Sequence, residues 1–288
     1  MATLREIKRR INSIKNTSKI TKAMKMVAAS KLRRLQTRLI QTRPYARNME
    51  IVISNLSAAI TEKEQFPLLQ IRPRKVIEVL VISADRGLCG SFNANIIKET
   101  NRITSELKQE SFDYTLSVIG KKARDYYTRR NVPLRKEWTG LSGTVTYEEA
   151  SEIAKAFIDD YVQGAFDELR IVYNEFESAL IQRIRQITLF PITPKKFEDV
   201  TQTVEYLYEP SIDAILRVLL NRYIYTEFFR ILLESNTSEE AARMVAMENA
   251  TQNARDMIGS LTLQYNKERQ SVITKEMLDI IGGAEALA

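Results

Sequence analysis

The chain has 288 residues, of which 44% are hydrophobic and 27% are charged, a composition typical of a folded protein rather than a disordered one. It contains no histidine and one cysteine, which removes the usual general base, the commonest metal ligand and any internal disulfide. The formal net charge of +7 is carried by one end, because residues 1–60 hold 14 Lys and Arg against 2 acids, whereas residues 211–288 hold 8 against 11.

Residues 4–60 carry apolar side chains at alternating spacings of three and four, the pattern of a coiled-coil seam. The seam turns polar between residues 18 and 25, and Pro44 is expected to kink or interrupt the helix. At about 1.5 Å per residue the helix is roughly 85 Å long, too long for the inside of a compact domain. The seam positions are Leu4, Ile7, Ile11, Ile14, Ser18, Thr21, Lys25, Ala28, Leu32, Leu35, Leu39, Met49, Ile53, Leu56 and Ile60, and a shifted apolar face comprises Ile20, Ala23, Met24 and Val27.

The middle of the chain changes from helical to β periodicity. We expect strands at 76–83, 114–119, 169–174 and 184–190, with helices at 93–107, at 121–130 and from Tyr147 onward. Thr146 and Glu149 form a capping box that opens the last of these helices. Strands that alternate with helices indicate a mainly parallel, Rossmann-like sheet.

The C-terminal segment repeats the helical pattern of the N-terminus. Residues 211–281 contain no proline and only one glycine, Gly259. Ser211 is a suitable N-cap, and Gly282–Gly283 a suitable stop. A second capping box, Thr237 with Glu240, leaves open the alternative that this segment forms two helices joined near Asn236. The apolar positions are Ile212, Ile215, Leu216, Leu219, Tyr223, Met244, Met247, Ala254, Ile258, Leu261 and Tyr265.

Neither terminal stripe can bury itself alone, so the two are expected to pair with each other. The predicted fold is of the α/β class: a long antiparallel coiled coil of N- and C-terminal helices with an inserted Rossmann-like α/β domain. The expected divisions are residues 1–60, 75–192 and 210–286. The opposite net charges of the two ends, +12 and −3, are consistent with this pairing.

The turn at residues 85–93 lies between a strand and a helix, where phosphates often bind. It contains only Gly87 and Gly90 and lacks the Lys-Ser/Thr of a phosphate-binding loop, so a tight structural turn is favoured over a nucleotide site. Cys89 has no histidine or second cysteine near it, and a buried small residue is favoured over a reactive thiol.

The basic N-terminal helix has several interpretations. Its Lys and Arg residues are suited to nucleic-acid phosphates, to a mitochondrial transit peptide or to an acidic surface of a protein partner. A charge run is also often only a solvated helix face. Residues 1–60 show heptads that continue beyond the length of a transit peptide, and residues 1–44 contain no aromatic side chain for base stacking.

Three long motifs resemble those of ATP synthase gamma subunits. The run 16–34 (NTSKITKAMKMVAASKLRR) closely resembles the N-terminal signature of that family, and the runs 241–253 (AARMVAMENATQN) and 265–276 (YNKERQSVITKE) resemble the C-terminal one. The run 83–93 (SADRGLCGSFN) is similar to the central motif, although Ser91 stands where many members have a second glycine. Order, spacing and length fit over essentially the whole chain.

The resemblance implies a rotor subunit of the central stalk. In the family the paired terminal helices form a shaft inside a ring of three alpha and three beta subunits, and the α/β domain meets the epsilon subunit and the c ring. Rotation of the c ring by ion flow turns the shaft, which changes the nucleotide affinity of each beta subunit in turn. The catalytic residues belong to beta, so we expect no catalytic residue, cofactor or metal here. The family also implies helices that continue, with bends, through Pro44 and the region of Thr237.

The resemblance also assigns contact residues. Lys22, Met24 and Lys25 are expected to meet an acidic lever of the beta subunit, with Lys31, Arg33 and Arg34 adding charge nearby. Arg269, Gln270 and Thr274 are expected to meet a loop of beta, and Ile280, Ile281 and Leu287 an apolar bearing.

The alternative functions belong to other classes. One is a basic coiled-coil protein that binds nucleic acid or acts as a scaffold, and the other is a dinucleotide-dependent enzyme, which would need a complete glycine fingerprint. No run of about 18 apolar residues occurs, and the first residues lack the apolar core of a secretory signal. We expect a peripheral membrane protein on the cytoplasmic face of a bacterial plasma membrane.

Overall fold

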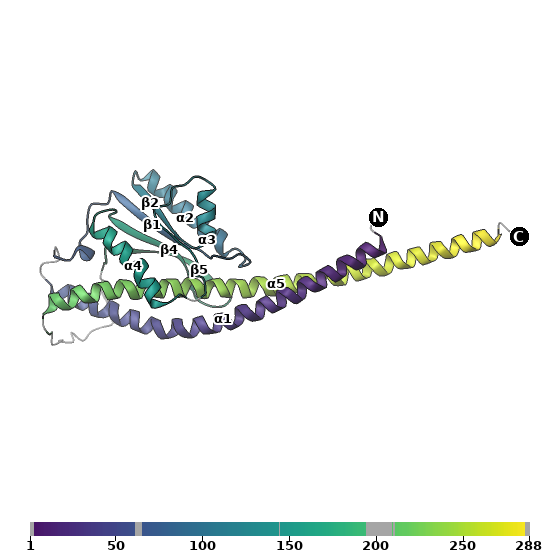
Figure 1. Cartoon of the computed structure of the whole chain (residues 1–288), viewed down its shortest axis with the longest axis horizontal. Helices are drawn as coiled ribbons and strands as arrows, with labels where there is room; N and C mark the ends of the chain where they lie inside the picture. The colour runs from purple at the N-terminus through teal and green to yellow at the C-terminus, as the bar shows by residue number, and fades with distance from the viewer. Residues whose placement is uncertain (1–2, 61–64, 144, 194–208, 210, 286–288) are drawn as a thin grey trace. The chain divides into compact units, whose positions relative to one another are not determined.

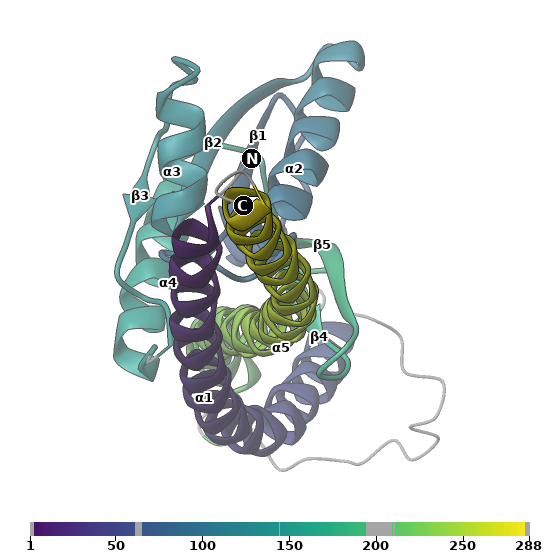
Figure 2. The ribbon, with the colours of Figure 1, turned by 90° about the vertical axis from the view of Figure 1, so that its right-hand side faces the viewer.

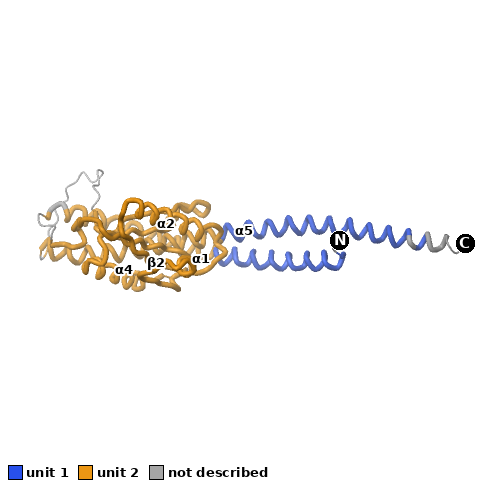
Figure 3. Tube along the Cα trace, turned by 90° about the horizontal axis from the view of Figure 1, so that it is seen from above, with its two compact units in different colours: residues 1–28, 244–288 blue, residues 29–243 orange. Residues whose placement is uncertain are grey.

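The computed structural model describes residues 3–60, 65–143, 145–193, 209 and 211–285. The chain forms two compact units, residues 1–28 with 244–288 and residues 29–243 (Figure 3). Two helices contribute to both units, namely α1 (Leu4–Ala59) and α5 (Ile212–Glu285). Within the described ranges, no helix combines the length and hydropathy needed to cross a bilayer.

Helix α1 continues through Pro44 without a break. The interruption expected from proline alone is therefore wrong, and the continuity implied by the family resemblance is confirmed. Pro44 lies on the exposed side of the helix, where water can bond to the carbonyl of Ile40 that proline leaves without a partner. In the unit of residues 29–243, the buried apolar side chains of α1 are Leu32, Leu35, Leu39, Ala46, Met49, Ile53 and Leu56.

A five-stranded sheet forms the centre of this unit, with the strand order β3-β2-β1-β4-β5. Strand β1 is parallel to β2 and β4, and β2 is parallel to β3, whereas β5 closes the sheet as an antiparallel hairpin with β4. The mainly parallel sheet is confirmed, but the two-residue β3 is too short for a periodic signal. The strands are β1 (Val76–Ile82), β2 (Asp113–Ile119), β3 (Glu137–Trp138), β4 (Glu168–Phe176) and β5 (Gln182–Phe190).

Helices cover both sides of the sheet. The side chains of α2 (Phe92–Gln109) and α3 (Lys121–Thr128) pack with Ile77, Val79 and Val81 of β1 in one apolar core. Figure 2 shows α4 (Tyr147–Val162) on the side opposite α2. The Thr146 hydroxyl accepts a hydrogen bond from the Glu149 amide at 3.2 Å, which confirms the predicted capping box. A short 3-10 turn, η2 (Pro67–Leu69), precedes β1.

Helix α5 is a single helix of 74 residues. The Ala214 amide donates to the Ser211 hydroxyl at 3.2 Å, so the predicted N-cap is confirmed. The possible break near Asn236 is wrong, because the Thr237 hydroxyl donates to the Leu233 carbonyl at 2.6 Å and caps nothing. The predicted stop at Gly282–Gly283 is also wrong, since the helix ends at Glu285; glycine weakens a helix without forbidding it.

Every residue of α5 from 231 to 241 is buried, although many of them are polar. The Ser238 hydroxyl donates to the carbonyl of Asn174 at 3.1 Å, and the Asn236 side-chain amide donates to the carbonyl of Leu141 at 3.0 Å. The ring of Phe228 stacks on that of Phe157 of α4 at 5.7 Å. Because these polar groups are bonded to a loop and to a strand of the sheet, this segment of α5 is an integral part of the unit.

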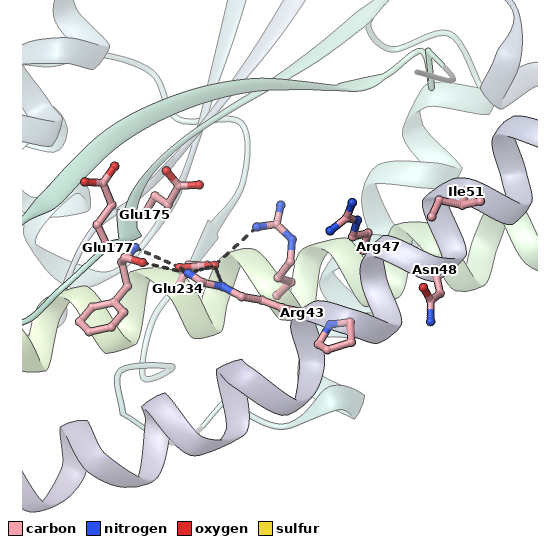
Figure 4. Close-up of a pocket in the computed structure, with 10 residues that line it drawn as sticks. Arg43, Arg47, Asn48, Ile51, Glu175, Glu177 and Glu234 are labelled. Carbon is pink, nitrogen blue, oxygen red and sulfur yellow. Dashed lines mark hydrogen bonds and ion pairs between the residues drawn. The ribbon is translucent and has the colours of Figure 1, made fainter. Parts of the chain in front are cut away.

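Arg43 links α1 to both β4 and α5 (Figure 4). Its guanidinium donates to both carboxylate oxygens of Glu234 at 2.9 Å and to the carbonyl of Phe176 at 2.9 Å. The Phe176 amide in turn donates to Glu234 at 3.0 Å. A hollow of about 980 Å³ adjoins this cluster, and the side chains of Arg47 and Ile51 also line it.

Candidate functional site

The two ends of the chain lie side by side in the unit of residues 1–28 and 244–288 (Figures 1 and 3). Thr21 faces Thr251 and Lys25 faces Glu248, so α1 and α5 run antiparallel here, as predicted. The buried side chains recur at the spacings expected of a coiled-coil seam. They are Ile7, Ile11, Thr21, Ala28, Met247, Thr251 and Ala254.

A buried polar pair interrupts the apolar seam. The hydroxyl oxygens of Thr21 and Thr251 are 2.7 Å apart. Each hydroxyl also lies within hydrogen-bond distance of a main-chain carbonyl of its own helix, Thr21 of Ser18 at 3.2 Å and Thr251 of Met247 at 2.7 Å, so either hydroxyl can be the donor between the two threonines. One turn further along α1, Lys25 forms an ion pair with Glu248. The predicted polar interval therefore contains cross-helix bonds between the two ends of the chain.

The outward face of α1 at this level is apolar and exposed. Ile20 is 60% exposed and Val27, two turns along the same stripe, is 57% exposed. Of the predicted contact residues, Lys22 is exposed and Met24 and Lys25 are half-buried. The shifted apolar face predicted from the sequence is thus present, and much of it remains uncovered within the described chain. A contiguous exposed apolar surface between lysines is typical of an interaction site.

The C-terminal part of α5 presents a second exposed surface. The predicted contact residues Arg269, Gln270 and Thr274 are all exposed, and the Thr274 hydroxyl donates to the carbonyl of Gln270 at 2.9 Å. Ile280 is 72% exposed and Ile281 55%, whereas the predicted Leu287 lies outside the described residues.

The same surface contains two residues that the sequence analysis missed. Ile273 is 48% exposed and Met277 is 58% exposed. They precede Ile281 at intervals of four residues, so all three side chains lie on one stripe of the helix. The spacing of four was the signal available in the sequence.

The turn after β1 is closed by its own side chains. Asp85 accepts hydrogen bonds from three main-chain amides, and these bonds lower its pKa below the ordinary value although burial acts in the opposite direction. Cys89 is buried, and burial raises the pKa of its thiol. Gly90 has a φ of 57°, as a tight turn requires. These features support the structural interpretation of this turn.

The described residues provide no evident metal centre. Among them, no group of three or more Asp, Glu or Cys side chains is arranged to hold a metal ion. The candidate sites are the exposed surfaces at the two ends of the chain, because exposed apolar side chains such as Ile20 and Ile280 are suited to contact with other proteins.

Comparison with known proteins identifies the family. A family model described as ATP synthase matches residues 3–287. The ATP synthase gamma chain of Anaeromyxobacter sp. Fw109-5 is 46% identical over 290 residues, and that of Pelotomaculum thermopropionicum is 42% identical over 287, with all of each chain covered. The chain belongs to the ATP synthase gamma-chain family. The predicted resemblance is confirmed, and with it the role of a central-stalk rotor subunit.

Solved structures with similar folds belong to ATP synthase central stalks. The chain is similar to one from the central stalk and c ring of Tetrahymena thermophila mitochondrial ATP synthase, with 26% identity, a TM-score of 0.60 and coverage of 80% of this chain and 99% of that one. A chain of Euglena gracilis mitochondrial ATP synthase shares the fold, with a TM-score of 0.69, 21% identity and coverage of 99% and 94%. None of these findings supports the alternative of a basic coiled-coil protein that binds nucleic acid or acts as a scaffold.

Proposed function

We propose that this gamma chain transmits torque between an ion-driven c ring and the catalytic sites of three beta subunits, and that it contributes no catalytic residue of its own. The observation that carries the proposal is the lengthwise pairing of the two chain ends, with exposed apolar and basic surface on the pair. Torque requires an element that resists twisting. Two helices joined by cross-helix bonds meet this need better than one.

The first contact of the shaft involves Lys22, Met24 and Lys25, which we assign to an acidic lever of the beta subunit. Lys22 is exposed on α1, and the half-buried Met24 lies within one turn of the exposed side chains of Ile20 and Val27. In the ion pair between Lys25 and Glu248, the lysine side chain is 37% exposed and the glutamate side chain 52% exposed. An ion pair so accessible to water contributes little stability. Lys25 can therefore exchange Glu248 for a carboxylate of beta at little cost.

The second contact lies further along α5. We assign Arg269, Gln270 and Thr274 to a loop of beta, and Ile280, Ile281 and Leu287 to an apolar bearing around the end of the shaft. Apolar contacts are non-directional, so a side chain can slide over them without breaking a defined bond. The stripe of Ile273 and Met277 extends this apolar surface.

The α/β domain is assigned to the opposite end of the coupling path. It would contact the epsilon subunit and the c ring, which would make the chain a peripheral membrane protein on the cytoplasmic face of a bacterial plasma membrane. In this assignment residues 1–60 and 210–286 are the helices of the shaft and residues 75–192 are the foot. Alpha and beta subunits, three of each, would surround the shaft.

Co-purification tests this proposal. We expect the chain to be inactive as an ATPase by itself and to be recovered with alpha and beta subunits when the three are expressed together. The ratio expected is one copy of the chain to three of each partner. ATPase activity in the isolated chain, or its failure to associate with alpha and beta, would contradict the proposal.

A further inference from the structure

The carboxyl ends of the parallel strands are where open α/β sheets bind their ligands, at the point where the strand order reverses. In this sheet β1 occupies that point, between β2 and β4. Asp85 lies at this edge, three residues after the end of β1. An acidic side chain therefore occupies the place where an anionic ligand would be expected.

The carboxylate of Asp85 bonds to two separate loops. One oxygen accepts from the Lys121 amide at 3.1 Å, and the other accepts from the Gly140 amide at 2.9 Å and the Ser142 amide at 3.1 Å. Its own amide donates to the Ser142 hydroxyl at 2.9 Å. Lys121 is the first residue of α3, so the carboxylate also lies at the positive end of that helix.

The surroundings hold this arrangement in place. Gly120 has a φ of 99°, and a Cβ atom there would lie 2.1 Å from the carbonyl oxygen of Ser83. The Ala123 amide donates to the Ser83 hydroxyl at 2.9 Å, and the Lys122 amide donates to the carbonyl of Ala84 at 3.0 Å. The start of α3 is therefore bonded to the residues that follow β1. These bonds hold the Asp85 carboxylate beside the first amide of α3, where a bound anion would lie.

The loop that Asp85 holds is also the loop on which α5 rests. The Leu141 carbonyl accepts from the side chain of Asn236 at 3.0 Å. Burial raises the pKa of the Glu239 carboxyl, which the Ser142 hydroxyl and Arg243 partly offset by hydrogen bonding. Residues 140–142 thus lie between Asp85 on one side and the buried segment of α5 on the other.

We propose that Asp85 is a built-in substitute for a bound anion and the positioning residue that seats α5 on the α/β domain through residues 140–142. Its carboxylate provides the three acceptor bonds that an oxyanion ligand would provide in an open site. The inference deepens the proposed function and rests on it in one respect. If the contact between residues 140–142 and α5 were weakened, the α/β domain could turn without turning α5 fully.

Amide hydrogen exchange in the full-length chain tests the positioning role without any partner. In the Asp85→Ala variant we expect the amides of Lys121, Gly140 and Ser142 to exchange about tenfold faster, with faster exchange in residues 231–241 as well. Formate should restore slow exchange in this variant because it fits the vacated site, and chloride at the same ionic strength should not. Unchanged exchange, or equal rescue by both anions, would overturn the proposal.

Two further variants keep the test decisive. Thr146→Ala removes the cap of α4, so its faster exchange should be confined to α4 and should not respond to formate. If Asp85→Ala does not fold, Asp85→Asn replaces it, because the amide has the same shape but directs a donor at main-chain donors. Normal exchange in Asp85→Asn would also contradict the proposal. A change in exchange without a loss of coupling in the assembled complex would leave Asp85 as a positioning residue and count against the torque path alone.

Discussion

Thr21 and Thr251 share a hydrogen bond of 2.7 Å across the seam of the terminal coiled coil, although 230 residues separate them in the sequence. Both side chains are buried. A shift of one helix along the other would separate the two hydroxyls and leave each without this partner. The pair therefore fixes the register in which the two ends of the chain meet, and with it the position of each exposed contact surface.

The threonine pair predicts non-additive mutational effects. Thr21→Val and Thr251→Val should each lower the local free energy of opening by about 1 kcal/mol, because each removes one partner of a buried hydrogen bond. The double variant should lose less than the sum, since it leaves no hydroxyl behind. Amide exchange of residues 18–25 measures these energies. The exposed Thr37→Val serves as the control and should have little effect; strictly additive losses would refute the pairing.

A second prediction concerns the anchoring of α1 beside the sheet. Among the described residues, Arg43→Ala leaves the Glu234 carboxylate, whose side chain is 1% exposed, with only Arg230 at 3.7 Å as a cationic partner. We expect the free energy of unfolding to fall by about 2 kcal/mol. The matched control is Arg47→Ala, one turn further along the same helix at an exposed position, which should change stability by less than about 0.5 kcal/mol. Urea unfolding measures both, and similar losses for the two variants would contradict the role given to Arg43.

Two glycines predict opposite responses to the same substitution. Gly120→Ala should prevent stable folding or lower the melting temperature sharply, since the new Cβ would meet a main-chain oxygen at 2.1 Å. Gly259→Ala meets no atom within 4 Å and lies inside a helix, so it should stabilise by about 0.5–1 kcal/mol. Thermal unfolding of both variants checks the prediction. A well-folded Gly120→Ala variant would show that the approach of Ser83 to α3 is not required.

The sequence determined the secondary structure most clearly where one periodicity persisted. The alternating spacings in residues 4–60 located most of the buried side chains from Ile7 to Leu56, because a long amphipathic helix has one solution for its apolar stripe. They missed the buried Ala46, and the predicted seam positions Ile14, Ser18 and Lys25 are only half-buried. Local signals failed where tertiary packing overrode them. Thr237 has the sequence of a cap, yet the burial of residues 231–241 keeps the helix continuous through it.

The candidate site was predictable in part. The accessible positions of Lys22 and Arg269 agree with a helix pattern read from the sequence, but what they contact came only from the family resemblance. The partner of Lys25 within the chain, Glu248, could not be predicted, since pairing between distant segments depends on register. The role of Asp85 was likewise hidden, because its three donors are main-chain amides, which any sequence supplies.

Met24 offers a test of coupling that is separate from assembly. Met24→Lys adds a positive charge at the proposed lever contact, so we expect a normal yield of complex but a lower ratio of ions pumped to ATP hydrolysed in reconstituted vesicles. Met257→Lys makes the same chemical change at a 45% exposed position of α5 that belongs to neither assigned contact, and it should pump normally. Unchanged pumping by Met24→Lys, or equal defects in both variants, would remove Met24 from the contact.

Direct observation of rotation tests the central claim that the paired ends of this chain form a turning shaft. A complex of this chain with alpha and beta subunits would be fixed to a surface through beta, with a visible probe attached to an exposed residue of the α/β domain such as Lys108. On addition of ATP, we predict rotation of the probe in one direction, with one step for each of the three beta subunits. A probe that stays still while the same complexes hydrolyse ATP would contradict the account.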